Sequence, residues 1–172
     1  MNRRKLLKKK LAILGFGQEG KSLLKFLRRS PKFKGSKIDI LDKKNNKGYL
    51  SRVSSFDLVF RSPGVPYNLP ELKSARKRGV EFSSGTKIFF EEYGGKIVGI
   101  TGTKGKGTTS TLLYKILRAA GKKVLLAGNI GKPAIDFLKS GEKYDWAILE
   151  LSSFQLQDLD ISPNLAVILD VF

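Results

Sequence analysis

The sequence predicts an α/β protein built from two parallel sheets. Short apolar runs of strand length alternate with amphipathic helical stretches, and glycine-rich turns directly follow two of these runs. The 172 residues, 41% of them hydrophobic, allow one domain or two small ones with a sizeable core. A glycine pair, Gly94-Gly95, separates the halves, so we predict domains at residues 1–94 and 95–172.

The first domain begins with a strand, a turn, a helix and a second strand. Leu11–Leu14 is the first strand, and the turn Gly15–Gly20 has the spacing G-x-G-x-x-G. A helix over residues 21–29 precedes a strand over 37–41, which ends in Asp42. An acidic residue about twenty positions beyond such glycines is typical of a dinucleotide fingerprint. We therefore predict a Rossmann-like domain, with a tight turn that binds nothing as the alternative. The candidate ligand-binding residues are Gly15, Phe16, Gly17, Gln18, Glu19 and Asp42.

A rigid loop lies further along the first domain. Residues 48–55 read as a loop or short helix, and residues 56–60 as a strand. The segment 61–66 then has two prolines and a glycine, at the strand end where α/β sheets bind ligands. Its candidate binding residues are Ser62, Pro63 and Gly64. The domain is predicted to continue with a helix over 69–78, a strand over 80–82 and a short helix over 87–93.

A strand, a glycine-rich turn and a helix open the second domain. Residues 97–101 are apolar, β-branched or glycine, and a helix after the turn runs to Ala120. Glycines let backbone N–H groups approach phosphate oxygens, and a helix N-terminus adds partial positive charge. Lys106 is placed to reach the outer phosphates. The predicted ATP-binding residues are Gly102, Thr103, Lys104, Gly105, Lys106, Gly107, Thr108 and Thr109.

The match to the consensus G-x-x-x-x-G-K-[ST] is imperfect. Ile100 replaces the first glycine, and Gly107 replaces the Ser or Thr that normally follows the lysine. The hydroxyl that would meet Mg²⁺ is therefore that of Thr108 or Thr109, and the sequence leaves the choice open. We interpret the turn as a P-loop-type nucleoside triphosphate site, and a surface turn without a ligand is the alternative.

Two polar residues follow later strands of the second domain. The strand over 123–127 leads to Asn129, and the strand over 145–151 carries Glu150 near its end. Carboxyl ends of parallel strands share one edge of a sheet, so Glu150 can hold Mg²⁺ there directly or through water. A surface ion pair for Glu150 and a helix N-cap for Asn129 are the alternatives. A helix over 133–138 and a terminal strand over 164–171 complete the domain.

The amino-acid composition excludes several kinds of catalytic and metal-binding side chain. The chain has no cysteine and no histidine, so it has no disulfide, no thiolate nucleophile and no imidazole base, and any metal would be held by oxygen atoms. The net charge of +18 invites a nucleic-acid interpretation, but the basic residues are dispersed and no nucleic-acid-binding motif appears. Small anionic ligands also require positive potential. We predict no nucleic-acid partner.

The N-terminus does not read as a targeting or membrane segment. Six of the first ten residues are Lys or Arg, and the apolar run that follows is too short for a signal peptide. No stretch approaches transmembrane length. We therefore expect a soluble, cytoplasmic protein without membrane insertion.

The sequence resembles the Mur ligase family in four landmarks that stand in the family's order. The fourth, which includes ELSSFQL, is similar to the branch of the family that adds D-glutamate. The resemblance covers essentially all of the chain, but only the first domain and the front half of the ATP-binding domain of the family. The landmarks are GFGQEGKS at 15–22, RSPGVP at 61–66, GITGTKGKGTT at 99–109, and GNIG at 128–131 with ELSSFQL at 150–156.

The resemblance implies an ATP-dependent ligase that adds D-glutamate to UDP-N-acetylmuramoyl-L-alanine through an acyl phosphate, in peptidoglycan synthesis. The first domain would hold the UDP moiety, Lys106 the ATP phosphates, and Glu150 with Thr108 the Mg²⁺ ion. It further implies catalytic roles for Lys106, Glu150 and Asn129, and a monomer at full length. Three residues would lie near the acceptor end of the UDP substrate: Asn129, Ser152 and Gln155.

The family's Asp-His pair, modified lysine and C-terminal domain come after the segment that this chain matches. We therefore expect residues 1–172 to bind ligands at most partially, to expose an aggregation-prone strand and not to catalyse ligation. Phosphate release that depends on both substrates, from purified residues 1–172, would contradict this expectation.

Two other functions stay open. A folylpolyglutamate-synthase-like glutamate ligase is favoured by GTKGKG but disfavoured by the first domain, and a non-enzymatic nucleotide- or nucleic-acid-binding module is favoured only by charge. Affinity for a UDP-sugar at physiological salt would separate the Mur-type ligase from both. A steep loss of DNA or RNA binding with salt would support the binding module.

Overall fold

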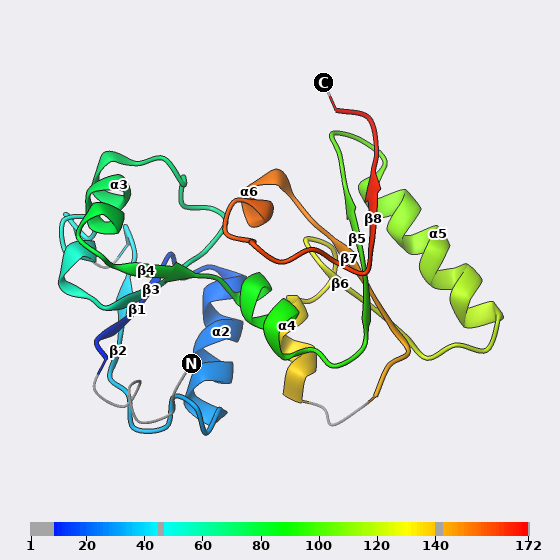
Figure 1. Ribbon diagram of the computed structural model, residues 1–172, viewed down its shortest axis with the longest axis horizontal. Coiled ribbons are helices and arrows are strands. Elements are labelled where there is room, and N and C mark those ends of the chain that lie inside the picture. The colour runs from blue at the N-terminus through cyan, green and yellow to red at the C-terminus, as the bar shows by residue number, and fades with distance from the viewer. Residues whose placement is uncertain (1–8, 45–46, 140–142, 172) are drawn as a thin grey trace. The chain divides into compact units, whose positions relative to one another are not determined.

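The computed structural model describes residues 9–44, 47–139 and 143–171, and it divides the chain into two compact units, Met1–Gly85 and Thr86–Phe172 (Figure 1). Each unit contains one four-stranded sheet in which all recorded strand pairs are parallel. The predicted α/β class with two parallel sheets is therefore confirmed. None of the helices in these three ranges is both long and apolar enough to cross a membrane.

Unit 1 has the strand order β2-β1-β3-β4. All four residues of β1 are buried, as expected for a central parallel strand covered on both faces. Leu23, Phe26 and Leu27 form the buried side of α2. The helix begins three residues before the predicted position, because Gly17 takes the extended backbone of an N-cap. The elements are β1 (Leu11–Leu14), α2 (Gln18–Arg29), β2 (Ile38–Leu41), the 3₁₀ helix η1 (Val53–Ser55), β3 (Leu58–Arg61), α3 (Pro70–Lys77) and β4 (Glu81–Ser83).

Unit 2 has the strand order β6-β7-β5-β8. Leu113 and Leu117 of α5 pack on one face of the sheet, against Val98, Ile100 and Ile148. Phenylalanines of α4 and η2 belong to the cluster that covers the other face. The elements are α4 (Gly85–Glu92), β5 (Lys96–Thr101), α5 (Lys106–Ala119), β6 (Val124–Gly128), the 3₁₀ helix η2 (Ala134–Lys139), β7 (Trp146–Glu150), α6 (Ser153–Leu156) and β8 (Leu165–Ile168).

Helix α4 lies at the division between the two units. The compact units separate between Gly85 and Thr86, after the first residue of this helix, whereas the boundary predicted from the glycine pair lies beyond its last residue. The helix packs with unit 2, because Phe89 and Phe90 are buried in the hydrophobic cluster that contains Ile97. Burial of two aromatic side chains outweighs the local turn signal of two glycines.

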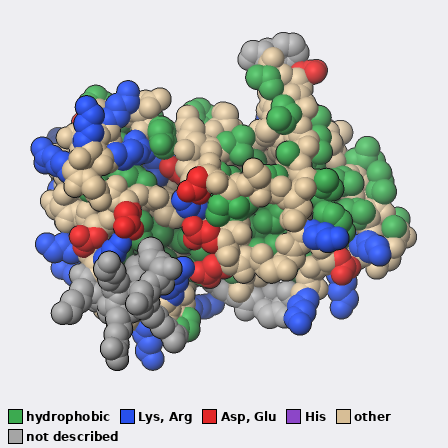
Figure 2. Space-filling model, viewed as in Figure 1, with side chains coloured by type: hydrophobic (Ala, Val, Ile, Leu, Met, Phe, Trp, Pro, Cys, Tyr) green, Lys and Arg blue, Asp and Glu red, His purple; other side chains and the backbone are tan. Residues whose placement is uncertain are grey.

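Further local features differ from the sequence prediction. The helix expected at 133–138 is a 3₁₀ helix, the terminal strand spans four residues instead of eight, and α6 was not predicted. Strand β8 pairs with β5 alone among the described residues. Figure 2 shows hydrophobic side chains on the surface over α5 and β8, where Ile116 is 54% and Ile168 71% exposed. Such exposed apolar edges favour association.

Candidate functional site

The glycine-rich turn of unit 1 is held tightly against its surroundings. Gly15 has φ +88°, its N–H donates to Leu41 O at 2.8 Å, and its carbonyl accepts from Ser62 Oγ at 2.7 Å. A Cβ on Gly20 would lie 2.4 Å from the Gly15 carbonyl oxygen, so only glycine allows α2 to start this close to β1. The fold thus brings the ends of β1, β2 and β3 together, as the sequence predicted.

Asp42 fastens this turn to the end of β2. Its carboxylate accepts the Phe16 N–H at 2.7 Å and the Lys44 N–H at 2.9 Å. These backbone donors, that of Lys44 first, lower the pKa of Asp42 from its ordinary value because they stabilise the ionised form. Asp42 therefore has a positioning role in the turn, in addition to the predicted role in ligand binding.

The Asp42 interactions predict a pH dependence. A lowered folded pKa means that the contribution of Asp42 to stability is present above its unfolded pKa of about 3.9 and is lost as the pH falls through the folded value. In an NMR titration, the Phe16 and Lys44 amide signals should shift together with a midpoint below pH ~3.9. Both transitions should vanish in Asp42→Asn and persist in Glu71→Gln, which changes an exposed carboxylate of the same unit. A common midpoint above that value would contradict the assignment.

A buried arginine supports the loop after β3. Arg61 is 1% exposed, and its guanidinium donates to the Val65 carbonyl and lies 5.4 Å from the centroid of the Tyr67 ring. This hydrogen bond joins the two ends of the loop that carries Ser62, Pro63 and Gly64. This arginine is part of the RSPGVP segment, but the sequence alone predicted no role for it, because nothing in a single sequence shows that an arginine is buried.

The glycine-rich turn of unit 2 joins β5 to α5 as predicted. Gly102 and Gly105 have φ +141° and +81°, and Gly105 is the N-cap of α5 without a side-chain cap. The first amides of α5 are therefore not used by a capping side chain. Lys106 Nζ donates to the carbonyls of Gly102 at 2.8 Å and Thr103 at 3.1 Å, so the ammonium group lies over the turn.

The two residues that follow β8, Leu169 and Asp170, contact this glycine-rich turn. Thr103 N–H donates to Asp170 O at 2.7 Å, and Leu169 N–H donates to Thr101 O at 2.9 Å. A Cβ on Gly102 would lie 2.8 Å from Leu169 Cβ. The conformation of the turn thus depends on a segment more than sixty residues away in the sequence, and no local signal indicates this contact.

Glu150 lies beside the first turn of α5. It is 7% exposed, its Oε1 accepts from Asn129 Nδ2 at 3.2 Å, and its Oε2 lies 3.4 Å from the position that a Cβ on Gly107 would occupy. The structure therefore brings together the predicted residues Glu150, Asn129 and the phosphate-loop helix. The missing side chain at Gly107 leaves Oε2 accessible from α5.

One carboxylate is enough for a magnesium site of the kind that nucleotides complete. Mg²⁺ is usually held by one or two carboxylates, with waters and substrate phosphates as the other ligands. Glu150 fits this requirement, and no cluster of three or more Asp, Glu, His or Cys occurs within the described ranges. Thr108 is exposed and Thr109 half-buried, and neither has a recorded hydrogen bond to Glu150.

Ser152 and Gln155 cap the short helix α6. Ser152 Oγ accepts the Gln155 N–H at 3.3 Å, and Gln155 Oε1 accepts the Ser152 N–H at 3.0 Å, which is a capping box. The Gln155 amide also donates to Thr86 Oγ1 at 3.5 Å. These two predicted substrate residues therefore have structural partners, and ELSSFQL specifies a strand end followed by a capped turn.

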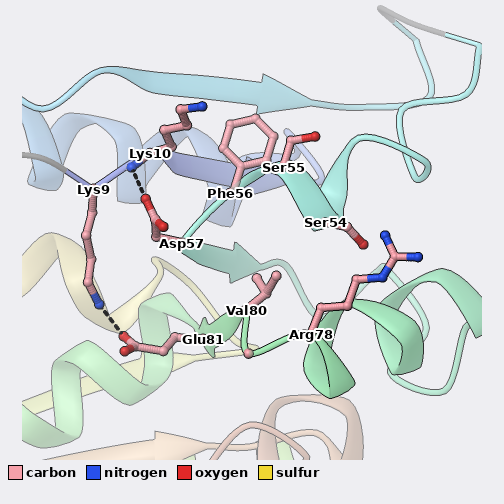
Figure 3. Close-up of a pocket in the computed structure, with 10 residues that line it drawn as sticks. Lys9, Lys10, Ser54, Ser55, Phe56, Asp57, Arg78, Val80 and Glu81 are labelled. Atoms are coloured by element: carbon pink, nitrogen blue, oxygen red, sulfur yellow. Dashed lines mark hydrogen bonds and ion pairs between the residues drawn. The ribbon is translucent and has the colours of Figure 1, made fainter.

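A cavity of about 450 Å³ lies at the opposite, amino ends of β1, β3 and β4 in unit 1 (Figure 3). Lys9 pairs with Glu81 at 2.8 Å, and Lys10 N–H donates to Asp57 Oδ2 at 2.6 Å. These contacts connect the three strands. Because its acidic groups are matched by donors, we assign this cavity a structural role.

The fold and these sites define a class of protein. Two parallel α/β units carry glycine-rich turns at the carboxyl edges of their sheets, which is where open α/β sheets bind nucleotides. Comparison with known proteins gives the family. Residues 100–171 match the Mur ligase middle domain, and the chain is a relative of the Mur ligases.

The most informative relatives carry one name. The UDP-N-acetylmuramoylalanine–D-glutamate ligase of Acetivibrio thermocellus is 35% identical over 98% of this chain and 40% of its own length. The ligase of the same name from Symbiobacterium thermophilum is 43% identical over 72% of this chain and 27% of its own length. The chain thus spans about 40% or less of these relatives.

A crystal structure supports the fold. The UDP-N-acetylmuramate:L-alanyl-gamma-D-glutamyl-meso-diaminopimelate ligase from Neisseria meningitides superimposes with a TM-score of 0.51 at 16% identity, over 95% of this chain and 61% of that one. At this level of identity the similarity concerns the fold alone.

Proposed function

We propose that this chain is the substrate- and ATP-binding part of a ligase that joins D-glutamate to UDP-N-acetylmuramoyl-L-alanine in cell-wall synthesis. The name shared by the relatives supports the reaction. The observation that carries the chemistry is the position of Glu150 beside the glycine-rich turn and α5. The reaction would take place in the cytoplasm, where ATP is available.

The proposed reaction has two steps. A carboxylate oxygen of the UDP substrate attacks the terminal phosphorus of ATP, and ADP leaves. The amine of D-glutamate then attacks the acyl carbon, an amide bond forms, and inorganic phosphate and a proton are released. Charge grows on the transferring phosphoryl group, so positive groups held in place are the main catalytic resource.

Each candidate residue of unit 2 has a role in this proposal. Lys106 and the amides of the turn would hold the outer phosphates of ATP, and Glu150 would hold Mg²⁺, which neutralises phosphate charge when bound. Asn129 orients the Glu150 carboxylate through Oε1. Thr108 or Thr109 would supply a hydroxyl to the same ion, and Ser152 with Gln155 would act near the acceptor end of the substrate.

Unit 1 would bind the UDP moiety at the carboxyl edge of its sheet. The amino end of α2 has no side-chain cap on its first turn, and such amides bind phosphate. The residues proposed to contact the ligand are Gly15, Phe16, Gly17, Gln18, Glu19, Asp42, Ser62, Pro63 and Gly64.

Hydrogen exchange tests the substrate assignment. UDP-N-acetylmuramoyl-L-alanine, and UDP more weakly, should protect residues 14–20 and 61–64 without ATP. NAD is the control ligand, because G-x-G-x-x-G also occurs in dinucleotide sites. Protection by NAD and none by the UDP compounds would replace the ligase with an ordinary dinucleotide-binding protein.

Glu150→Gln tests the metal. The amide keeps the size and the contact with Asn129 but removes the charge, so ATP affinity should fall about tenfold or more with Mg²⁺ and change little without it. Calorimetry in magnesium and in EDTA provides the comparison, with Glu92→Gln as a control for charge on an exposed site of unit 2. Equal losses under both conditions would make Glu150 a structural residue.

A further inference from the structure

A second cavity of unit 2, about 790 Å³ in volume, lies at the amino end of β6. Val124 pairs with Trp146 at this end of the sheet, and Gly128 pairs with Glu150 at the other. Four residue steps of about 3.3 Å separate the two ends by roughly 13 Å. The cavity is therefore distinct from the candidate ATP site.

Positive charge converges on this cavity from three elements. Arg118 comes from the last turn of α5, Lys122 and Lys123 precede β6, and Lys143 precedes β7. Among the described residues that line the cavity none is acidic, and the three lysine side chains have no ion pair with a described residue. The nearby Asp145 accepts the Lys123 backbone N–H at 2.9 Å. Because no described acidic side chain forms an ion pair with them, these four cations favour a ligand with several negative charges.

Aromatic side chains form the remaining walls. Tyr114 of α5, Phe137 of η2 and Tyr144 before β7 are half-buried and line the same space. Arg118 Nη1 donates to the Tyr114 hydroxyl at 3.0 Å, which fixes one ring beside one cation. Flat rings next to cations provide a surface on which a planar base can stack.

From this combination we infer that the cavity is a second nucleotide site, which binds a base with two or more phosphates. The base lies against the rings of Tyr114 and Tyr144, and the phosphates lie among Lys122, Lys123 and Lys143. The volume is within the range of about 300–1,000 Å³ found for small-ligand sites, which favours a free nucleotide over a nucleic-acid strand.

The test uses the whole chain with Lys106→Ala, which disables the candidate loop site, and ADP without Mg²⁺ as the probe. Calorimetry should show one ADP per chain, and hydrogen exchange should show protection at residues 122–126. Adding Lys123→Glu should weaken ADP binding at least about tenfold, and adding Tyr114→Leu should weaken it about fivefold. Lys115→Glu, an equal charge change at an exposed position on α5 outside the cavity, should leave affinity within about twofold.

Four results would overturn the inference. The first is a Lys106→Ala protein that does not bind ADP, and the second is an equal effect of Lys115→Glu and Lys123→Glu. Pyrophosphate that binds as tightly as ADP would show that no base is recognised. A short single-stranded oligonucleotide that binds more tightly through the same residues would make the cavity a nucleic-acid contact. Circular dichroism of each variant checks the fold, and Tyr114→Leu keeps an apolar side chain for that reason.

Discussion

Lys106→Ala is expected to abolish magnesium-dependent ATP binding at the glycine-rich turn, with a loss of affinity of at least about 100-fold, on the order of 3 kcal/mol. The ammonium group of Lys106 already lies over the turn, on the carbonyls of Gly102 and Thr103. From there it can rotate to the outer phosphates, where a charge-assisted contact is strong. The amides of the turn alone cannot replace that charge.

The measurement is calorimetry of Mg²⁺-ATP in a Lys123→Glu background, with hydrogen exchange of residues 102–109 to locate the bound nucleotide. This background removes the second nucleotide site inferred above from the signal. Lys115→Ala is the matched control, because it removes an exposed lysine from the same helix. Unchanged ATP affinity and unchanged protection in Lys106→Ala would refute the phosphate-loop assignment.

Gly128→Ala is expected to destabilise unit 2 by about 2–5 kcal/mol, the sum of overpacking and a left-handed backbone. Gly128 has φ +109°, and a Cβ there would lie 2.3 Å from the Glu150 carbonyl oxygen and 3.1 Å from its nitrogen. Both contacts are to backbone, so β6 would have to separate from β7 where the strands end. The same displacement moves Glu150 away from α5, and Mg²⁺-dependent ATP binding should fall as well.

Thermal unfolding followed by the fluorescence of Trp146, the only tryptophan in the chain, reports on unit 2. The midpoint should fall by roughly 10 °C, at about 2–4 °C per kcal/mol for a protein of this size. Gly94→Ala is the control in the same unit, since a Cβ there would meet nothing within 4 Å. A midpoint for Gly128→Ala that equals the Gly94→Ala value would show that the strands can absorb the extra carbon.

The sequence predicted the strands, turns and helices around the candidate sites well, because these elements depend on local pattern. A strand, a glycine-rich turn and a helix follow one another at Leu11–Leu14 and again at Lys96–Thr101, as their spacing predicted. Glu150 and Asn129 were expected at one edge of the sheet, because parallel strands end together. They lie there within hydrogen-bonding distance of each other.

Local sequence pattern did not predict two other features of the structure. The sequence indicated a helix after Pro133, but its hydrogen bonding is of the 3₁₀ type. Helix α4 was grouped with the first domain, and its phenylalanines pack in the second unit. Both outcomes depend on which neighbours are available for packing, and tertiary context overrides propensity in such short segments.

By itself the sequence determined the class of fold and the order of its strands, and it predicted which residues make up the candidate sites. It did so because hydrophobic period, glycine spacing and strand-end polar residues are local properties. Only the tertiary structure decided that Arg61 is buried beneath a loop, and that Leu169 and Asp170 support the turn that carries Lys106. The same is true of the cations and rings that converge at the amino end of β6. These contacts join residues distant in the chain, and their energies arise from burial and close approach in three dimensions.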